Sequence, residues 1–95
     1  MEDRTKNFIN TVIFVSRIFS GLKDKFLARK LYDKLSDFIS TYSLPPKDNV
    51  AQYYHQLKIT TDSLLELLDY LEHSKTTAAT PLLYARRSLF AFKLQ

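Results

Sequence analysis

The chain has 95 residues, so we expect a single domain spanning residues 1–95, because two independent cores would each be too small. One glycine and three prolines are too few turn residues for a β-sandwich or barrel. The absence of cysteine excludes disulfides and cysteine-ligated zinc. The net charge of +4 permits a polyanionic partner but does not require one.

The N-terminal region does not have the pattern of a secretory signal. Its first residues, Met-Glu-Asp-Arg-Thr-Lys, carry mixed charge, whereas the start of a secretory signal is basic. The most apolar stretch, residues 8–19, is interrupted by polar residues and is shorter than the roughly 20 residues that cross a bilayer. We therefore expect a soluble, cytoplasmic protein without a membrane span.

The first predicted helix covers about residues 4–21. Apolar residues recur there every three to four positions, which places them on one helix face. Additional apolar residues widen this face, so the helix is expected to lie centrally or to meet a second subunit. Gly21, the only glycine, is a predicted left-handed C-terminal cap, and Asp24 is a predicted N-cap for the next helix. The face comprises Phe8, Val12, Val15, Phe19 and Leu22, and the widening residues are Ile9, Ile13, Phe14 and Ile18.

Three more helices are predicted, over about residues 24–42, 47–73 and 81–95. Pro45-Pro46 ends the second of these four helices, because the residue before a proline avoids the α region. Thr80 and Pro81 form a typical helix start. The connections are short, which favours antiparallel neighbours. The sequence thus predicts an all-α fold, an antiparallel up-and-down four-helix bundle. The third helix has the most regular repeat, with Val50, Tyr54, Leu57, Thr61, Leu64, Leu68 and Leu71 on its apolar face.

The sequence contains none of the motifs that commonly bind cofactors or metals or carry out catalysis. A single glycine excludes the glycine-rich phosphate-binding loops and the G-x-S-x-G elbow. His55 and His73 lack the Glu-x-x-His spacing of a di-metal bundle. We therefore expect a protein that is not an enzyme, without catalytic, cofactor-binding or metal-binding residues.

Charged residues are grouped along the chain. Residues 17–34 hold six basic and two acidic residues, residues 62–72 hold four acidic and no basic residues, and no acid follows Lys75. One interpretation is that these are solvated helix faces that partly neutralise one another. The other is that the second and fourth helices bind phosphates while the third meets another subunit. The predicted nucleic-acid-binding residues are Arg86, Arg87, Lys93, Arg29, Lys30 and Lys34. The predicted homo-oligomer interface comprises Phe14, Ile18, Asp62, Glu66 and Asp69.

An aromatic–basic mix also occurs near the start of the third predicted helix. Tyr53 and Tyr54 lie close in sequence to Lys47 and Lys58, a combination that can stack unpaired bases. Packing in the core with a solvated hydroxyl is the alternative explanation for these tyrosines.

The segment 31–95 resembles the accessory variability determinant family, small helical bundles encoded beside the reverse transcriptases of diversity-generating retroelements, which are related to the bacterial four helix bundle proteins. The resemblance rests on Leu31-Tyr32-Asp33, Pro46-Lys47, residues 64–68, Ser74-Lys75 and Pro81-Leu82-Leu83-Tyr84-Ala85-Arg86-Arg87. The family has a further helix after the one that resembles 81–95, whereas this chain has an additional helix before residue 24. Residues 16–23 are similar to that last helix, which would make the helix order circularly permuted.

This resemblance implies a non-enzymatic, pentameric adaptor that binds nucleic acid and a partner protein, with a reverse transcriptase as the partner. Its motif-matched basic positions are Arg86 and Arg87, followed by Lys47 and Lys75. The alternative function is a protein-interaction bundle without a nucleic-acid role. Bacteriocin immunity proteins, which are also small, basic and four-helical, are the nearest example.

Overall fold

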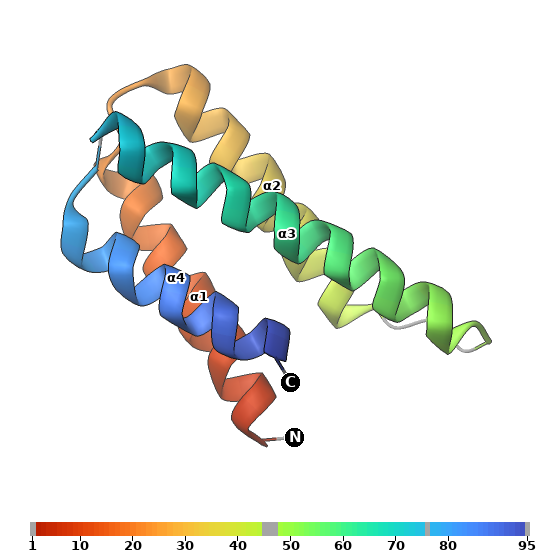
Figure 1. The fold of residues 1–95 in the computed structure, drawn as a ribbon. Coiled ribbons are helices and arrows are strands. Elements are labelled where there is room, and N and C mark those ends of the chain that lie inside the picture. The colour runs from red at the N-terminus through yellow and green to blue at the C-terminus, as the bar shows by residue number, and fades with distance from the viewer. Residues whose placement is uncertain (1, 45–47, 76, 95) are drawn as a thin grey trace.

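The structure is a computed structural model and describes residues 2–44, 48–75 and 77–94. It contains four α-helices: α1 (Glu2–Gly21), α2 (Lys25–Ser43), α3 (Val50–Ser74) and α4 (Ala79–Leu94). No β-strand occurs in the described ranges. Successive helices run in opposite directions (Figure 1), so the predicted all-α, up-and-down four-helix bundle is confirmed.

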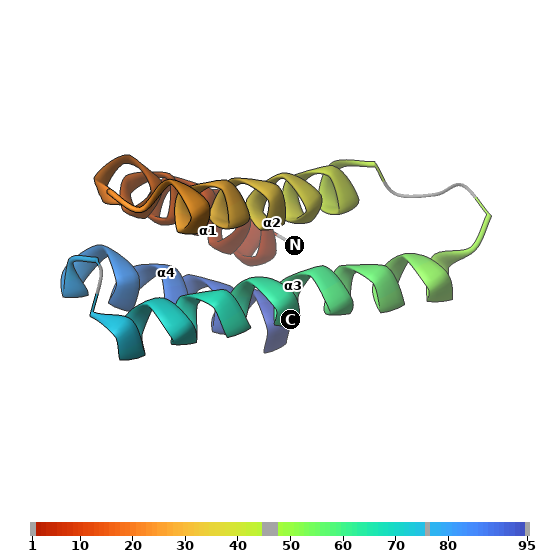
Figure 2. The ribbon, with the colours of Figure 1, turned by 90° about the horizontal axis from the view of Figure 1, so that it is seen from above.

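The helices are arranged in two layers, with α1 and α2 in one and α3 and α4 in the other (Figure 2). The closest packing joins α1 to α4 and α2 to α3, while α1 and α2 have the least extensive contact of the neighbouring pairs. Within the described chain, no Cα atom of α2 lies within 8 Å of α4. The hairpin of α2 and α3 extends beyond the α1–α4 pair at the end near Ser43 and Val50 (Figure 1).

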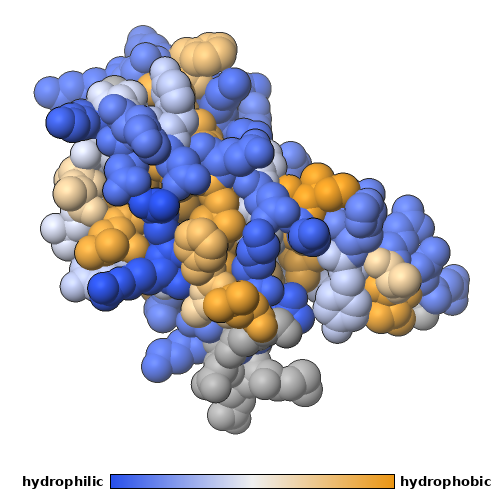
Figure 3. Space-filling model, viewed as in Figure 1, coloured by the Kyte–Doolittle hydropathy of each residue, from blue (hydrophilic) through white to orange (hydrophobic). Residues whose placement is uncertain are grey.

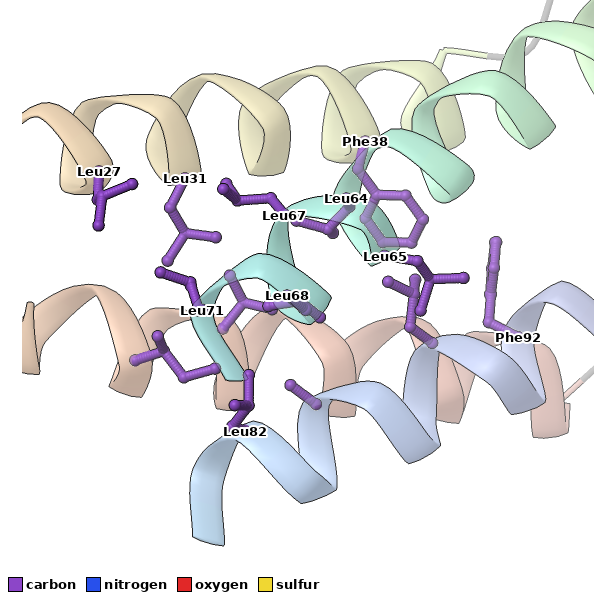
Figure 4. Packing of buried hydrophobic residues seen from close by; sticks show 14 of the residues in the cluster. Leu27, Leu31, Phe38, Leu64, Leu65, Leu67, Leu68, Leu71, Leu82 and Phe92 are labelled. Atoms are coloured by element: carbon purple, nitrogen blue, oxygen red, sulfur yellow. The ribbon is translucent and has the colours of Figure 1, made fainter. Parts of the chain in front are cut away.

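One hydrophobic core joins all four helices. Leucines of α2 and α3 point toward residues of α4 across the bundle (Figure 4). An aromatic cluster joins three helices: Phe8 of α1 stacks on Tyr42 of α2 with 4.2 Å between ring centroids, and Phe38 meets the ring of Phe92 of α4 at 5.2 Å. Such pairs add about 0.5–1.5 kcal/mol each beyond their area burial. The labelled core residues in the close-up are Leu27, Leu31, Phe38, Leu64, Leu65, Leu67, Leu68, Leu71, Leu82 and Phe92.

The connection between α1 and α2 has one predicted cap and lacks the other. The Asp24 carboxylate accepts hydrogen bonds from the backbone N–H groups of Phe26 and Leu27 at 2.9 and 3.2 Å, so its predicted N-cap is confirmed. The left-handed conformation expected for Gly21 is wrong, because Gly21 has no positive φ. The Leu22 N–H instead donates to the carbonyl of Phe19 at 3.2 Å, a tight final turn that needs no left-handed residue.

The other helix ends differ from the predicted ones by a few residues. Asn49 caps α3 by accepting from the Gln52 N–H at 2.9 Å, so this helix begins at Val50 rather than near 47. Helix α4 begins at Ala79, which places Thr80 and Pro81 in its first turn. Lys75 caps the end of α3 in the left-handed conformation, with φ 54°. The predicted break at Pro45-Pro46 lies outside the described residues, although α2 does end at Ser43.

The apolar face of α3 is only partly buried. Its residues from Leu57 to Leu71 lie in the core, as predicted, whereas Val50 and Tyr54 are 58% and 51% exposed. The reason is the extended hairpin, since the first turns of α3 lie past the end of the α1–α4 pair (Figure 1). None of the helices in the described ranges is both long and apolar enough to cross a membrane.

Candidate functional site

Two of the three predicted nucleic-acid-binding residues of α4 are engaged by acids of α3. Arg86 Nη2 lies 2.7 Å from Asp69 Oδ1 and Nη1 lies 2.5 Å from Glu72 Oε1. Lys93 Nζ lies 2.7 Å from Asp62 Oδ1. The acids recur every three to four residues on α3, so they line the side that faces the antiparallel α4. The acidic and basic segments therefore neutralise each other within the chain here, as one interpretation of the charge pattern expected.

Arg87 differs from its two neighbours in the predicted site. Its side chain is exposed, and it forms no ion pair with any residue that the structure describes. Leu83, Phe90 and Leu94 are also exposed, at 48%, 46% and 84%, and helical spacing places them beside Arg87. Figure 3 shows apolar side chains among the hydrophilic surface over this helix. The outer side of α4 is thus apolar with one unpaired cation.

The predicted basic residues of α2 lie apart from those of α4. Arg29 forms an exposed ion pair with Asp33 at 3.5 Å, and Lys30 Nζ lies 5.4 Å from the ring centroid of Phe26. Lys34 donates a hydrogen bond to the hydroxyl of Ser63 on α3. Helices α2 and α4 lie diagonally across the bundle, with no Cα atoms within 8 Å of each other in the described structure, so the six predicted cations do not form one surface.

Most of the predicted oligomer interface is already used within the chain. Ile18 is a core residue with 1% exposure, so it is not accessible to a second subunit. Phe14 stacks on Tyr84 of α4 with 5.2 Å between ring centroids. Asp62 and Asp69 bind α4, as described above, which leaves Glu66 exposed. It lines a groove of about 510 Å³ between α2 and α3 together with Lys30 and Lys34.

Helix α1 leaves a different set of apolar residues exposed. Ile9, Ile13 and Phe19 are 49%, 42% and 40% exposed, and Tyr32 of α2 is 56% exposed. The rings of Phe19 and Tyr32 meet across the two helices with 6.1 Å between centroids. Beside them lies a groove of about 210 Å³ lined by Ser16, Phe19, Leu31, Tyr32 and Leu35. We call Ile9, Ile13, Phe19 and Tyr32 the α1–α2 apolar strip.

The two tyrosines of the aromatic–basic mix have different roles. Tyr53 is partly buried, and its hydroxyl donates to the carbonyl of Tyr42 at 3.1 Å, which matches the core-packing explanation. Burial raises the pKa of the Tyr53 hydroxyl, while the positive charge of Arg4 opposes this effect. Tyr54 instead lines a pocket with Lys58 and Arg4. Arg4 was not among the predicted site residues, although its position four residues before Phe8 places both on one helix face.

The two histidines have no metal-binding arrangement. In the described part of the chain, no group of three or more histidine, aspartate or glutamate residues is placed to hold a metal ion. His73 Nδ1 lies 2.8 Å from the carbonyl oxygen of Asp69, one turn earlier in α3. His55 is exposed on the same helix.

No protein-family model matches the chain, and no curated protein sequence or solved structure is significantly similar to it.

Proposed function

We propose that the chain is a non-enzymatic helical adaptor that binds protein, and that it self-associates through the α1–α2 apolar strip. The observation that carries this proposal is the exposure of Ile9, Ile13, Phe19 and Tyr32, which ranges from 40% to 56%. Phe19 and Tyr32 contact each other across the two helices, and Ile9 and Ile13 lie one turn apart on α1. Exposed apolar side chains that group in this way are typical of interaction sites.

The surroundings of the strip also favour a protein partner. Ile9 and Ile13 are one turn apart on α1, and Arg17 follows one turn later, so a charged residue borders the row. On α2 the exposed pair of Arg29 and Asp33 flanks Tyr32. An apolar centre with a charged rim is the usual organisation of a protein–protein interface.

A second copy of the chain can pack on this surface without bringing like charges together. The strip itself carries no charged residue, so two copies that meet face to face bring no like charges together at the centre. The chain as a whole has a net charge of +4, which disfavours apposition of its basic surfaces. A two-fold symmetric dimer uses the same patch on both subunits, so in such a dimer each uncharged strip would face another uncharged strip.

The test compares two isoleucines of similar exposure. Ile13 in the strip is 42% exposed and Ile59 on α3 is 47% exposed. Light scattering coupled to size exclusion should show that Ile13→Glu weakens self-association by about 30-fold or more, as loss of an interface residue worth about 2 kcal/mol would. Ile59→Glu should leave it unchanged. A wild-type monomer, or equal effects of the two substitutions, would contradict the proposal.

Nucleic-acid binding is the second candidate, and the unpaired, exposed Arg87 is the observation that favours it. In this proposal the chain is an accessory protein that holds nucleic acid beside a partner such as a reverse transcriptase, as the family resemblance implies. Filter binding should then show that Arg87→Gln lowers the salt slope on duplex DNA by about 0.9, while Lys6→Gln on α1 serves as the control. Absence of DNA or RNA retention at about 50 mM salt would exclude this candidate.

A further inference from the structure

A pocket of about 380 Å³ lies where α1 begins and α4 ends, against the first half of α3. This volume is within the range of small-molecule sites, about 300–1,000 Å³. The pocket is distinct from the α1–α2 apolar strip, with which it shares no residue. Its lining residues are Arg4, Tyr54, Leu57, Lys58, Thr61, Phe92 and Lys93.

The pocket has an excess of positive charge. Among the residues whose side chains the structure describes, its lining includes Arg4, Lys58 and Lys93 and no acidic residue. Asp62 neutralises Lys93 at 2.7 Å, whereas Arg4 and Lys58 form no ion pair with any residue that the structure describes. Two positive charges without an ion-pair partner among the described residues therefore border the same space. A phosphate monoester carries a charge of about −1.5 to −2 near neutral pH, which would balance them.

Arg4 is held in place by aromatic rings. Its guanidinium carbon lies 4.7 Å from the ring centroid of Phe92 and 5.6 Å from that of Tyr54, and both contacts are attractive cation–π interactions. Its Nε is buried and finds no hydrogen-bond partner in the described structure. A guanidinium fixed in this way presents a fork of N–H donors that suits the oxygens of a phosphate.

We propose that this pocket binds a phosphate monoester attached to a small organic group. The phosphate contacts Arg4 and Lys58, and the organic group packs against the ring of Tyr54, which is 51% exposed. The buried Thr61 hydroxyl, which donates to the carbonyl of Leu57 at 2.7 Å, lies in the floor of the pocket. This site does not depend on self-association, because it uses neither α2 nor the α1–α2 apolar strip.

Calorimetric titration with AMP, inorganic phosphate and adenosine tests the proposal on the wild-type chain. AMP should bind, inorganic phosphate should compete with it, and adenosine should not bind. Lys58 is exposed, so Lys58→Gln should keep the fold by circular dichroism while weakening AMP binding about tenfold, the effect of one lost charge-assisted contact. Lys58→Arg should retain binding. Lys23→Gln, which removes the same charge from the connection between α1 and α2, should have no effect.

Three results would overturn the proposal: no AMP binding at millimolar concentration, equal binding of adenosine and AMP, or equal weakening by Lys58→Gln and Lys23→Gln. A single-stranded oligonucleotide with and without a 5′-phosphate then identifies the source of the ligand. Tighter binding of the phosphorylated strand than of AMP indicates a strand end, whereas equal or weaker binding indicates a free nucleotide. Both results require the same phosphate chemistry.

Discussion

Tyr53 shows how one side chain stabilises the junction between α2 and α3. Its hydroxyl donates to the carbonyl of Tyr42 near the end of α2, and its ring packs against the core. Burial raises its pKa above the ordinary value of 10.0, since the ionised form would be poorly solvated. A raised folded-state pKa means that the protonated hydroxyl stabilises the fold below the unfolded-state value, and that this contribution is lost as the pH rises through the folded-state pKa.

We expect Tyr53→Phe to lower the free energy of unfolding by about 1 kcal/mol at neutral pH, through loss of one hydrogen bond. As the pH rises above about 10, the wild type should lose stability more steeply than the variant, because only the wild type must ionise the partly buried hydroxyl at position 53. Urea unfolding at several pH values measures both effects. Tyr70→Phe, at a position that is 55% exposed, is the control, and a pH dependence identical in wild type and Tyr53→Phe would refute this role.

Arg86 and Arg87 are adjacent in the sequence but differ in what they contact. Arg86, with its side chain 26% exposed, binds Asp69 and Glu72, whereas Arg87 has no ion pair among the described residues. Arg86→Gln should therefore cost about 1 kcal/mol of stability at low salt and less at about 1 M salt. Arg87→Gln should change stability by less than about 0.5 kcal/mol. Thermal unfolding at two salt concentrations distinguishes them, and equal costs would show that the ion pairs contribute nothing.

The sequence predicted that charged residues of different helices could pair, but not which residues would do so. The charge blocks indicated that acids of one helix could neutralise bases of another, but they did not show that Arg86 and Lys93 would be paired while Arg87 would not. That difference arises from rotation: adjacent helical positions are about 100° apart, so which arginine faces α3 depends on how α4 packs. Arg4 was missed because its pocket is formed by three helices.

At the scale of the elements, apolar periodicity predicted all four helices, and the cap at Asp24 followed from local side-chain chemistry. The left-handed caps were not predictable in the same way. Gly21 was expected to adopt this conformation because it is the only glycine, but the tight turn from Leu22 to Phe19 removes the need. Lys75 adopts it instead, with φ 54°, because α3 continues to Ser74 before the chain turns toward α4.

The backbone conformations at Gly21 and Lys75 predict that removing the glycine from the first position and introducing one at the second should both stabilise the fold. A Cβ added at Gly21 meets nothing within 4 Å, and its φ is not positive, so Gly21→Ala should stabilise by about 0.5–1 kcal/mol. Lys75→Gly should stabilise by a similar amount, because a left-handed residue with a side chain is strained. Urea midpoints of the two variants provide the measurement. Destabilisation by Gly21→Ala would mean that Gly21 does adopt the left-handed conformation.

At the scale of the whole molecule, short connections predicted the antiparallel order but not the tightness of each pair. The structure joins α1 closely to α4 and loosely to α2, which no pattern within one helix reveals. This arrangement buries Ile18 and places Phe14 against Tyr84, while Ile9 and Ile13 remain exposed. The sequence predicted that α1 lies centrally or meets a second subunit. Ile18, which was predicted for that interface, lies in the core instead, and the second subunit stays a prediction.

Sedimentation equilibrium of the wild-type chain over a range of micromolar concentrations tests the central claim most directly. Self-association through the α1–α2 apolar strip predicts an average mass that rises with concentration toward at least twice the 11.1 kDa of one chain. The same experiment on Ile13→Glu should give the mass of one chain under the same conditions. A wild-type mass of 11.1 kDa at every concentration would contradict the account.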